Sequence, residues 1–201
     1  MKYLMLYGLL FLSIQPALSN QRYTVYCEAS FLEASSDSMI SQIGTTEATG
    51  RNDGTVEKYL RSVGLSKGLP YCAAGQYWCF RVAAEALGIM IKNIPIPRTG
   101  LANAIYKRAK KRGRRTKFKP QRHDLIVWRK GKTAFGHVER ITSVGKAGYV
   151  TTVGFNTSPG KGKSQRDGQG VWKRRRNIFH PLGRMRVRGL VGFITERRGV
   201  K

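Results

Sequence analysis

Acidic residues, histidine and cysteine are all scarce in this sequence. The 201 residues include only 11 Asp or Glu against 37 Lys or Arg, which gives a formal net charge of +26. Three His and three Cys, without paired ligand spacing, exclude the usual zinc sites. We therefore expect no metal and no cofactor. The length is typical of one domain with a modest core.

No apolar run is long enough to cross a bilayer, which takes roughly 20 residues. The longest run, residues 4–14 (LMLYGLLFLSI), follows Lys2 and precedes small residues at 16–19 (PALS). This is the pattern of a secretory signal. We expect a signal peptide at residues 1–19 and a periplasmic or secreted mature chain with no transmembrane anchor. A lipoprotein is disfavoured because Cys27 lies well beyond the apolar run.

The mature chain would keep 36 basic against 11 acidic side chains, a net charge of +25. Such a surface attracts polyanions, which include nucleic acid, anionic envelope polymers and phospholipid head groups. Residues 107–119 (KRAKKRGRRTKFK) are the most basic stretch. We interpret them as a solvated loop or exposed helix face, with a specific binding patch as the alternative. Phe118 is their only aromatic residue, so stacking on a single nucleic-acid strand is poorly supported.

The order of predicted elements indicates an α+β domain. Residues 20–42 carry no motif and are rich in serine, so we interpret them as a leader or linker and begin the domain, residues 43–201, after them. An apolar face predicts a helix within 47–64, and a Gly-x-Pro break precedes a second helix over 73–87. Runs rich in β-branched residues predict strands at 125–128, 137–144, 149–156, 171–176 and 187–194.

The three cysteines differ in their settings. Cys72 and Cys79 lie roughly 10 Å apart along the second helix, too far for a disulfide. A Cys27–Cys79 bond is possible and would leave Cys72 as the free thiol. Cys72 stands at a helix start, which favours the thiolate and hence a nucleophile. The alternative of an inert buried cysteine fits Cys79 better, because Cys79 lies in the middle of an apolar helix.

A nucleophilic cysteine needs a base, and His137 is the best candidate because it opens a predicted strand. His123 lies in a polar turn, and His180 precedes a proline. A symmetric loop at 145–148 would place His137 opposite Asn156, with Cβ atoms roughly 5 Å apart, so that the amide could orient the imidazole. An ordinary cross-strand polar pair is the alternative, and a slip of one residue would separate the two.

Motifs around these residues resemble the CHAP family of cysteine, histidine-dependent amidohydrolases and peptidases. Residues 68–74 (GLPYCAA) resemble its G-x-P-[WY]-C-A-A nucleophile motif, and 136–138 (GHV) its base motif. Residues 123–128 (HDLIVW) are similar to its G-D-hydrophobic strand. Residues 152–157 (TVGFNT) resemble its T-[IV]-E-G-N-T segment, and 170–176 its closing strand. The similarity spans residues 43–195.

The resemblance implies a papain-like α+β fold, related to that of NlpC-type wall hydrolases. In this fold N-terminal helices, one of them starting at the catalytic cysteine, pack on an antiparallel sheet. It implies Cys72 as nucleophile, His137 as base and Asn156 as the third polar residue. It also implies hydrolysis of an amide bond in peptidoglycan, as a peptidase or as an N-acetylmuramoyl-L-alanine amidase.

Two departures from the family pattern concern one carboxylate. The family often has Glu where this chain has Gly154, and usually Gly where this chain has Glu139. In the predicted hairpin these two residues face each other. One hypothesis is that the carboxylate has moved across the hairpin and supports the site from Glu139. The alternative is a solvent-facing Glu139, with Asn156 as sole orienting residue.

Together these observations favour an exported, monomeric peptidoglycan hydrolase that uses a Cys–His thiol mechanism. Its basic surface would be attracted to anionic envelope polymers. Two alternatives stay open: a catalytically inactive wall-binding domain, which the missing Glu at 154 would explain, and a basic nucleic-acid-binding protein. The signal peptide and the ordered Cys and His motifs argue against nucleic acid as a partner.

Overall fold

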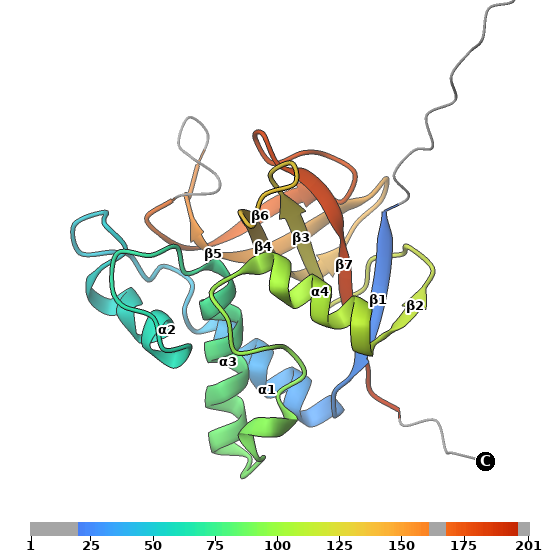
Figure 1. The fold of residues 1–201 in the computed structure, drawn as a ribbon, viewed down its shortest axis with the longest axis horizontal. Helices are drawn as coiled ribbons and strands as arrows, with labels where there is room; N and C mark the ends of the chain where they lie inside the picture. Colours follow the sequence, from blue (N-terminus) through green and yellow to red (C-terminus); the bar gives the residue numbers. More distant parts are fainter. Residues whose placement is uncertain (1–19, 161–167, 197–201) are drawn as a thin grey trace, which may run out of the picture.

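A computed structural model of the chain describes residues 20–160 and 168–196, and the expected signal peptide at 1–19 lies outside them. One seven-stranded sheet is packed against helices (Figure 1). The strands are β1 Gln21–Tyr26, β2 Arg114–Thr116, β3 Leu125–Arg129, β4 Gly136–Val144, β5 Tyr149–Thr157, β6 Gly170–Asn177 and β7 Arg186–Ile194. The helices are α1 Ala29–Ile40, α2 Glu57–Ser62, α3 Cys72–Ala86 and α4 Ala102–Arg112, with single 3₁₀ turns at Gly54–Val56 and Ile91–Asn93.

The strand order is β2-β1-β7-β3-β4-β5-β6, and every neighbouring pair is antiparallel except β1 and β7. Helix α3 packs on β4 and β5, α4 packs on β1, β3, β4 and β7, and α1 and α2 pack against α3 (Figure 1). The predicted α+β class is therefore confirmed. All five predicted strands and the helix that starts at Cys72 are present, with bounds shifted by one or two residues.

Strand β3 is apolar throughout because the sheet is covered on both faces. Leu125 and Val127 pack with side chains of α1, α3 and α4. Ile126 and Trp128 point to the other face, where the β6–β7 connection packs on them. All four side chains are at most 1 % exposed. This explains why the sequence here lacks the polar alternation of a strand with one wet face.

The prediction that residues 20–42 form a leader or linker is wrong, because they form β1 and α1. Strand β1 lies between β2 and β7 inside the sheet. Helix α1 buries Phe31, Leu32 and Met39. Its serines are compatible with a helix because their hydroxyls bond back to carbonyls of the preceding turn, as Ser35 does to Leu32 at 2.8 Å. The serine-rich composition therefore did not indicate a loop.

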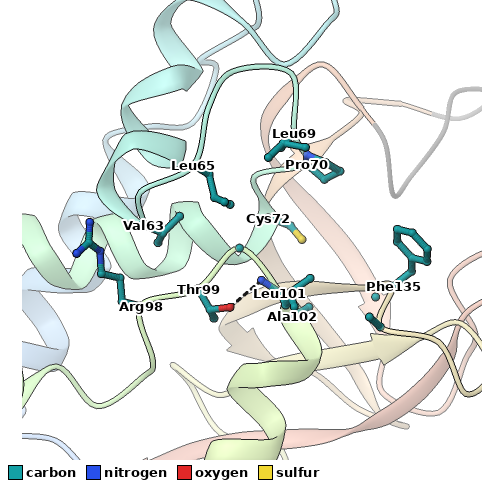
Figure 2. Close-up of a pocket in the computed structure, with 13 residues that line it drawn as sticks. Val63, Leu65, Leu69, Pro70, Cys72, Arg98, Thr99, Leu101, Ala102 and Phe135 are labelled. Atoms are coloured by element: carbon teal, nitrogen blue, oxygen red, sulfur yellow. Dashed lines mark hydrogen bonds between the residues drawn. The ribbon is translucent and has the colours of Figure 1, made fainter.

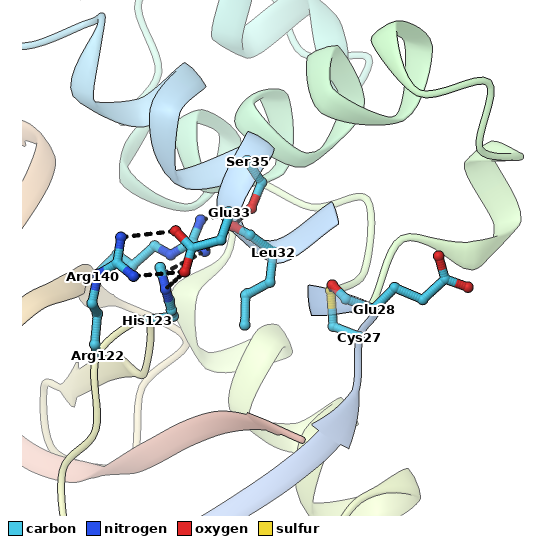
Figure 3. A network of polar contacts seen from close by, with 8 residues as sticks. All are labelled: Cys27, Glu28, Leu32, Glu33, Ser35, Arg122, His123 and Arg140. Atoms are coloured by element: carbon cyan, nitrogen blue, oxygen red, sulfur yellow. Dashed lines mark hydrogen bonds and ion pairs between the residues drawn. The ribbon is translucent and has the colours of Figure 1, made fainter. Parts of the chain in front are cut away.

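A buried polar network joins α1 to the sheet (Figure 3). Arg140 of β4 is fully buried and donates to the Ser35 hydroxyl and the Leu32 carbonyl, both at 2.9 Å. Burial and the charge of Arg140 lower the pKa of His123 to about 4. His123 is therefore neutral: its Nδ1 accepts from Arg140 at 3.2 Å, and its Nε2 donates to Glu33 at 3.0 Å. The N-terminal helix is thus attached to the strand that carries His137.

The β4–β5 hairpin reaches the predicted register by an unexpected route. A symmetric loop would pair Val144 with Tyr149, but Val144 pairs with Val150. A bulge between Ile141 and Ser143 then shifts the register by one residue. As a result Glu139 lies opposite Gly154, as predicted. Turn residues alone do not indicate such a bulge.

The basic stretch 107–119 is divided between the end of α4 and β2. Lys107 and Arg108 are exposed on α4, whereas Tyr106 and Ala109 of the same helix are buried, so this half is the expected exposed helix face. The three cysteines are all free and buried, which leaves the possible Cys27–Cys79 disulfide unformed. Within the described residues, no helix is long and apolar enough to cross a membrane.

Candidate active site

Cys72 is the first residue of α3, directly after the Gly-x-Pro break. No side chain caps this helix start, and the backbone N–H groups of its first turn point away from the helix body. The thiol is 4 % exposed and opens on a surface cavity, into which its sulfur points (Figure 2). The cysteine therefore combines a helix N-terminus with access from solvent.

The cavity has a volume of about 590 Å³ and a mostly apolar wall. Leu101 and Phe135 stand at its rim and are 52 % and 63 % exposed (Figure 2). Arg98 is the one charged residue among the described residues that line it. Its Nε donates to the Ser62 carbonyl at 3.0 Å. An apolar cleft with a single cation and a buried thiol suits a peptide-like ligand that carries a carboxylate.

Gly75 sets how closely α3 approaches the sheet. A Cβ at this position would lie 2.3 Å from the ring of Phe155 in β5, so only glycine allows the contact. Because Gly75 is three residues after Cys72, this close packing fixes the helix start relative to β5. The A-A-G sequence after Cys72 therefore serves the position of the thiol.

His137 is the second residue of β4 and is fully buried. It pairs with Trp128 of β3, whose ring lies 6.0 Å from the imidazole ring between centroids. Its Nε2 lies 3.1 Å from Oε1 of Glu139, two residues along the same strand face. Its Nδ1 has no aligned hydrogen-bond partner within the described residues. The side chain of Cys72, from helix α3, interacts electrostatically with the same ring. Loosely aligned catalytic contacts are common in structures without substrate.

The electrostatics of the pair favour a charged imidazole. Burial lowers the pKa of His137, but the interactions of the ring with Cys72 and with Glu139 outweigh burial and raise the pKa to about 9. Burial also raises the pKa of Glu139, yet its contacts with His137 and Arg176 lower it overall. At neutral pH the arrangement is therefore an imidazolium between a carboxylate and the cysteine sulfur.

Glu139 is completely buried, and both oxygens of its carboxylate are hydrogen-bonded. Besides His137, its oxygens accept from Arg176 at 2.6 Å and 2.9 Å and from the Thr152 hydroxyl at 2.5 Å. A buried carboxylate is stable only when paired and hydrogen-bonded in this way. The alternative of a solvent-facing Glu139 is therefore wrong, and the carboxylate is in contact with the base.

Gly154 makes room for this carboxylate. A Cβ at residue 154 would lie 2.8 Å from Cγ and 2.9 Å from Oε1 of Glu139. The carboxylate is held by His137, Arg176 and Thr152, so it has little freedom to yield. The two departures from the family pattern are therefore coupled: Gly154 vacates the space that Glu139 occupies.

Asn156 does not hydrogen-bond the imidazole. Strand β5 is irregular between Gly154 and Thr157, and Asn156 has a φ of 54°, which turns it out of the regular ladder. Its side-chain amide is buried and has no hydrogen-bond partner within the described residues. The hydroxyl of Tyr71, the residue before Cys72, donates to Glu47 at 3.1 Å.

The two residues that hold Glu139 were not predicted from the sequence. Thr152 and Arg176 lie on the same face of β5 and β6 as Gly154, because Thr152 pairs with Arg174 and Val150 with Arg176. The available signal was a lone acid in a buried strand, which demands a cation nearby. Finding which arginine supplies it required the register of β6.

A largely antiparallel sheet with a cysteine at a helix start and a histidine on a strand defines the papain-like class of fold. The comparison with family models identifies a CHAP domain over residues 64–156, a range that contains Cys72, His137, Glu139 and Asn156. Residues 64–156 therefore match the CHAP family, as the motifs of the sequence suggested. Such domains are associated with amidohydrolase or peptidase activity, often on peptidoglycan. Neither the curated proteins nor the solved structures gave a match.

Proposed function

We propose that the chain is an exported cysteine hydrolase that cleaves an amide bond of peptidoglycan. The observation that carries the proposal is the row formed by Cys72, His137 and Glu139 at the cleft. The thiol opens on the cavity, the imidazole is next to the thiol, and the carboxylate bonds Nε2. Since Glu139 occupies Nε2, the nitrogen left for proton exchange with Cys72 is Nδ1.

The proposed reaction is acyl transfer through a thioester. The Cys72 thiolate attacks the scissile carbonyl while His137 holds the proton on Nδ1. The developing oxyanion is stabilised by backbone N–H groups, among them that of Cys72 at the uncapped start of α3. His137 then protonates the leaving amine, and a water molecule hydrolyses the thioester with His137 as base. Glu139 keeps the imidazole oriented throughout.

The cleft suits the peptide part of peptidoglycan. Leu101, Phe135 and their apolar neighbours contact a peptide chain, and Arg98 is placed to bind a carboxylate of that chain. Arginine is well suited to this role because its planar guanidinium matches a carboxylate with two parallel hydrogen bonds. An export route would bring the protein to this substrate, since peptidoglycan lies outside the cytoplasmic membrane.

Release of soluble muropeptides from purified sacculi tests the proposal. Residues 20–201 should release fragments, and the Cys72→Ala variant should release none while keeping the same melting temperature. Fragment masses would distinguish a peptidase from an amidase. If neither protein releases fragments although both are folded and bind sacculi, the chain is a wall-binding domain and the proposal is wrong.

A further inference from the structure

The β3–β4 loop, residues 130–135, borders two separate hollows. Ala134 and Phe135 line the catalytic cleft. Gly131 and Lys132 line a second hollow of about 690 Å³, which we call the basic groove. Its other walls come from α4, the first residues of β1 and the start of β7.

The basic groove concentrates positive charge without compensation. The described residues that line it include six cationic side chains and no acidic one. The cationic residues are Lys110, Arg129, Lys132, Arg184, Arg186 and Arg188. A hollow lined by six cations differs from a solvated basic helix face, because the charges on its walls all border the same space and can interact with one bound chain.

The arrangement carries a cost in the absence of a ligand. Arg129 lies directly opposite Arg186 in the β3–β7 ladder, and like charges in such a pair destabilise a sheet. Burial and the charge of Arg129 both lower the pKa of Arg188. A bound anion would offset this repulsion, so the groove is suited to an anionic occupant.

The chemistry of the groove selects among anions. Four of its six cations are arginines, whose planar forks match phosphate oxygens. Among the described residues that line the groove, Tyr106 is the only aromatic one; it is 5 % exposed, and the guanidinium of Arg188 lies over its ring at 4.8 Å. This described lining therefore offers no ring face on which a nucleobase could stack. The groove can bind phosphate charge along a chain but cannot hold bases.

We infer that the basic groove binds a phosphodiester polymer without nucleobases, of the kind found in cell envelopes. The amide of Asn103 connects this groove to the catalytic cleft. Its Nδ2 donates to the carbonyls of Ala134 at 2.9 Å and Phe135 at 3.2 Å, and its Oδ1 accepts from Arg188 at 2.8 Å. A polymer bound in the groove would therefore hold the catalytic cleft close to the envelope material that carries it. This binding goes beyond the proposed hydrolysis and does not depend on it.

Two charge-matched triple variants test the inference. The groove variant changes Lys132, Arg184 and Arg186 to Gln; all three are exposed. The control variant changes a separate set of exposed cations around a hollow beside β2: Arg114, Arg115 and Lys117. Both variants lose three positive charges, so any attraction due to net charge alone falls equally in both. The probes are purified poly(glycerol phosphate) and single-stranded DNA with the same number of phosphates.

The groove variant should bind poly(glycerol phosphate) about tenfold more weakly, whereas the control should lose less than about threefold. In a plot of log affinity against log salt concentration, the slope should become shallower by about 2 units in the groove variant. Each phosphate contact on a flexible single strand contributes roughly 0.7 to this slope, and the variant loses three cations. Equal losses of affinity in both variants would show that binding depends on net charge and not on the groove, and would overturn the inference. Tighter, groove-dependent binding of DNA would also overturn it. Hydrolysis of soluble muropeptides by the groove variant, expected at the native rate, reports separately on the proposed function.

Discussion

Replacing Glu139 by Gln removes the charge next to His137 and keeps the shape of the side chain. The carboxylate is buried, 3.1 Å from the imidazole and 2.6 Å from Arg176. In the variant His137 loses one of the two partners that raise its pKa to about 9, while the opposing effect of burial remains. The pKa of His137 should therefore fall, and the alkaline limb of kcat/KM should move to lower pH.

The rate should fall as well, because the amide no longer favours the imidazolium that forms with the thiolate. Acid–base catalysis contributes on the order of 10²–10⁴ in rate, and the loss should lie in that range. The free energy of unfolding should drop by about 3 kcal/mol, since Arg176 loses a buried carboxylate partner. The assay is the pH profile of muropeptide hydrolysis from about pH 6 to about pH 10, together with thermal melts.

The matched variant is Asn156→Ala, which removes the other candidate for orienting the base. It should keep its rate within about tenfold and leave the pH profile in place, because the Asn156 amide makes no hydrogen bond within the described residues. If Glu139→Gln retains the full rate and the native pH profile while Asn156→Ala loses about a hundredfold or more, the assignment of Glu139 is refuted. Asn156 would then be the orienting residue.

Three further variants and one titration follow from the same contacts. Gly154→Ala should lower kcat without a comparable change in KM, because its Cβ would displace the Glu139 carboxylate; a native kcat would contradict the packing. Arg98→Gln should raise KM for substrates with a free carboxylate and spare amidated ones, as steady-state kinetics would show. Deletion of residues 20–42 should abolish cooperative unfolding in circular dichroism, and a native melt would contradict the integration of β1 and α1. The raised pKa of His137 contributes stability below its unfolded value of about 6.5 that is lost as the pH rises through about 9, so the melting temperature should fall across that interval.

The sequence allowed prediction of the elements that local composition specifies. Runs of β-branched residues located the five strands from β3 to β7, and the Gly-x-Pro break located the start of α3 at Cys72. The serine-rich N-terminal segment was misassigned because its fold depends on tertiary packing: Ser35 becomes compatible with a helix through Leu32 and is then held by Arg140. The sequence pattern around Ser35 does not indicate a partner as distant in the chain as Arg140.

The candidate site was predictable in part for the same reason. The motifs indicated Cys72 and His137, and the hairpin register placed Glu139 against Gly154. The predicted hydrogen bond between Asn156 and the imidazole is not formed, because β5 is irregular beyond Gly154. Arg176 was missed because its reach to Glu139 depends on the pairing of a third strand. Bulges and long cross-strand contacts are properties of the sheet rather than of any one segment.

The pairing of Glu139 with Gly154 also constrains how such a site can change. A carboxylate at both residues would force two like charges into one buried space, and a carboxylate at neither would remove the anion that faces Arg176. Either intermediate should be a poor enzyme, so the two residues can exchange only as a unit. Relatives that carry Glu at one of these two positions and a small residue at the other would be equivalent in chemistry, although each looks defective when the two positions are compared one at a time.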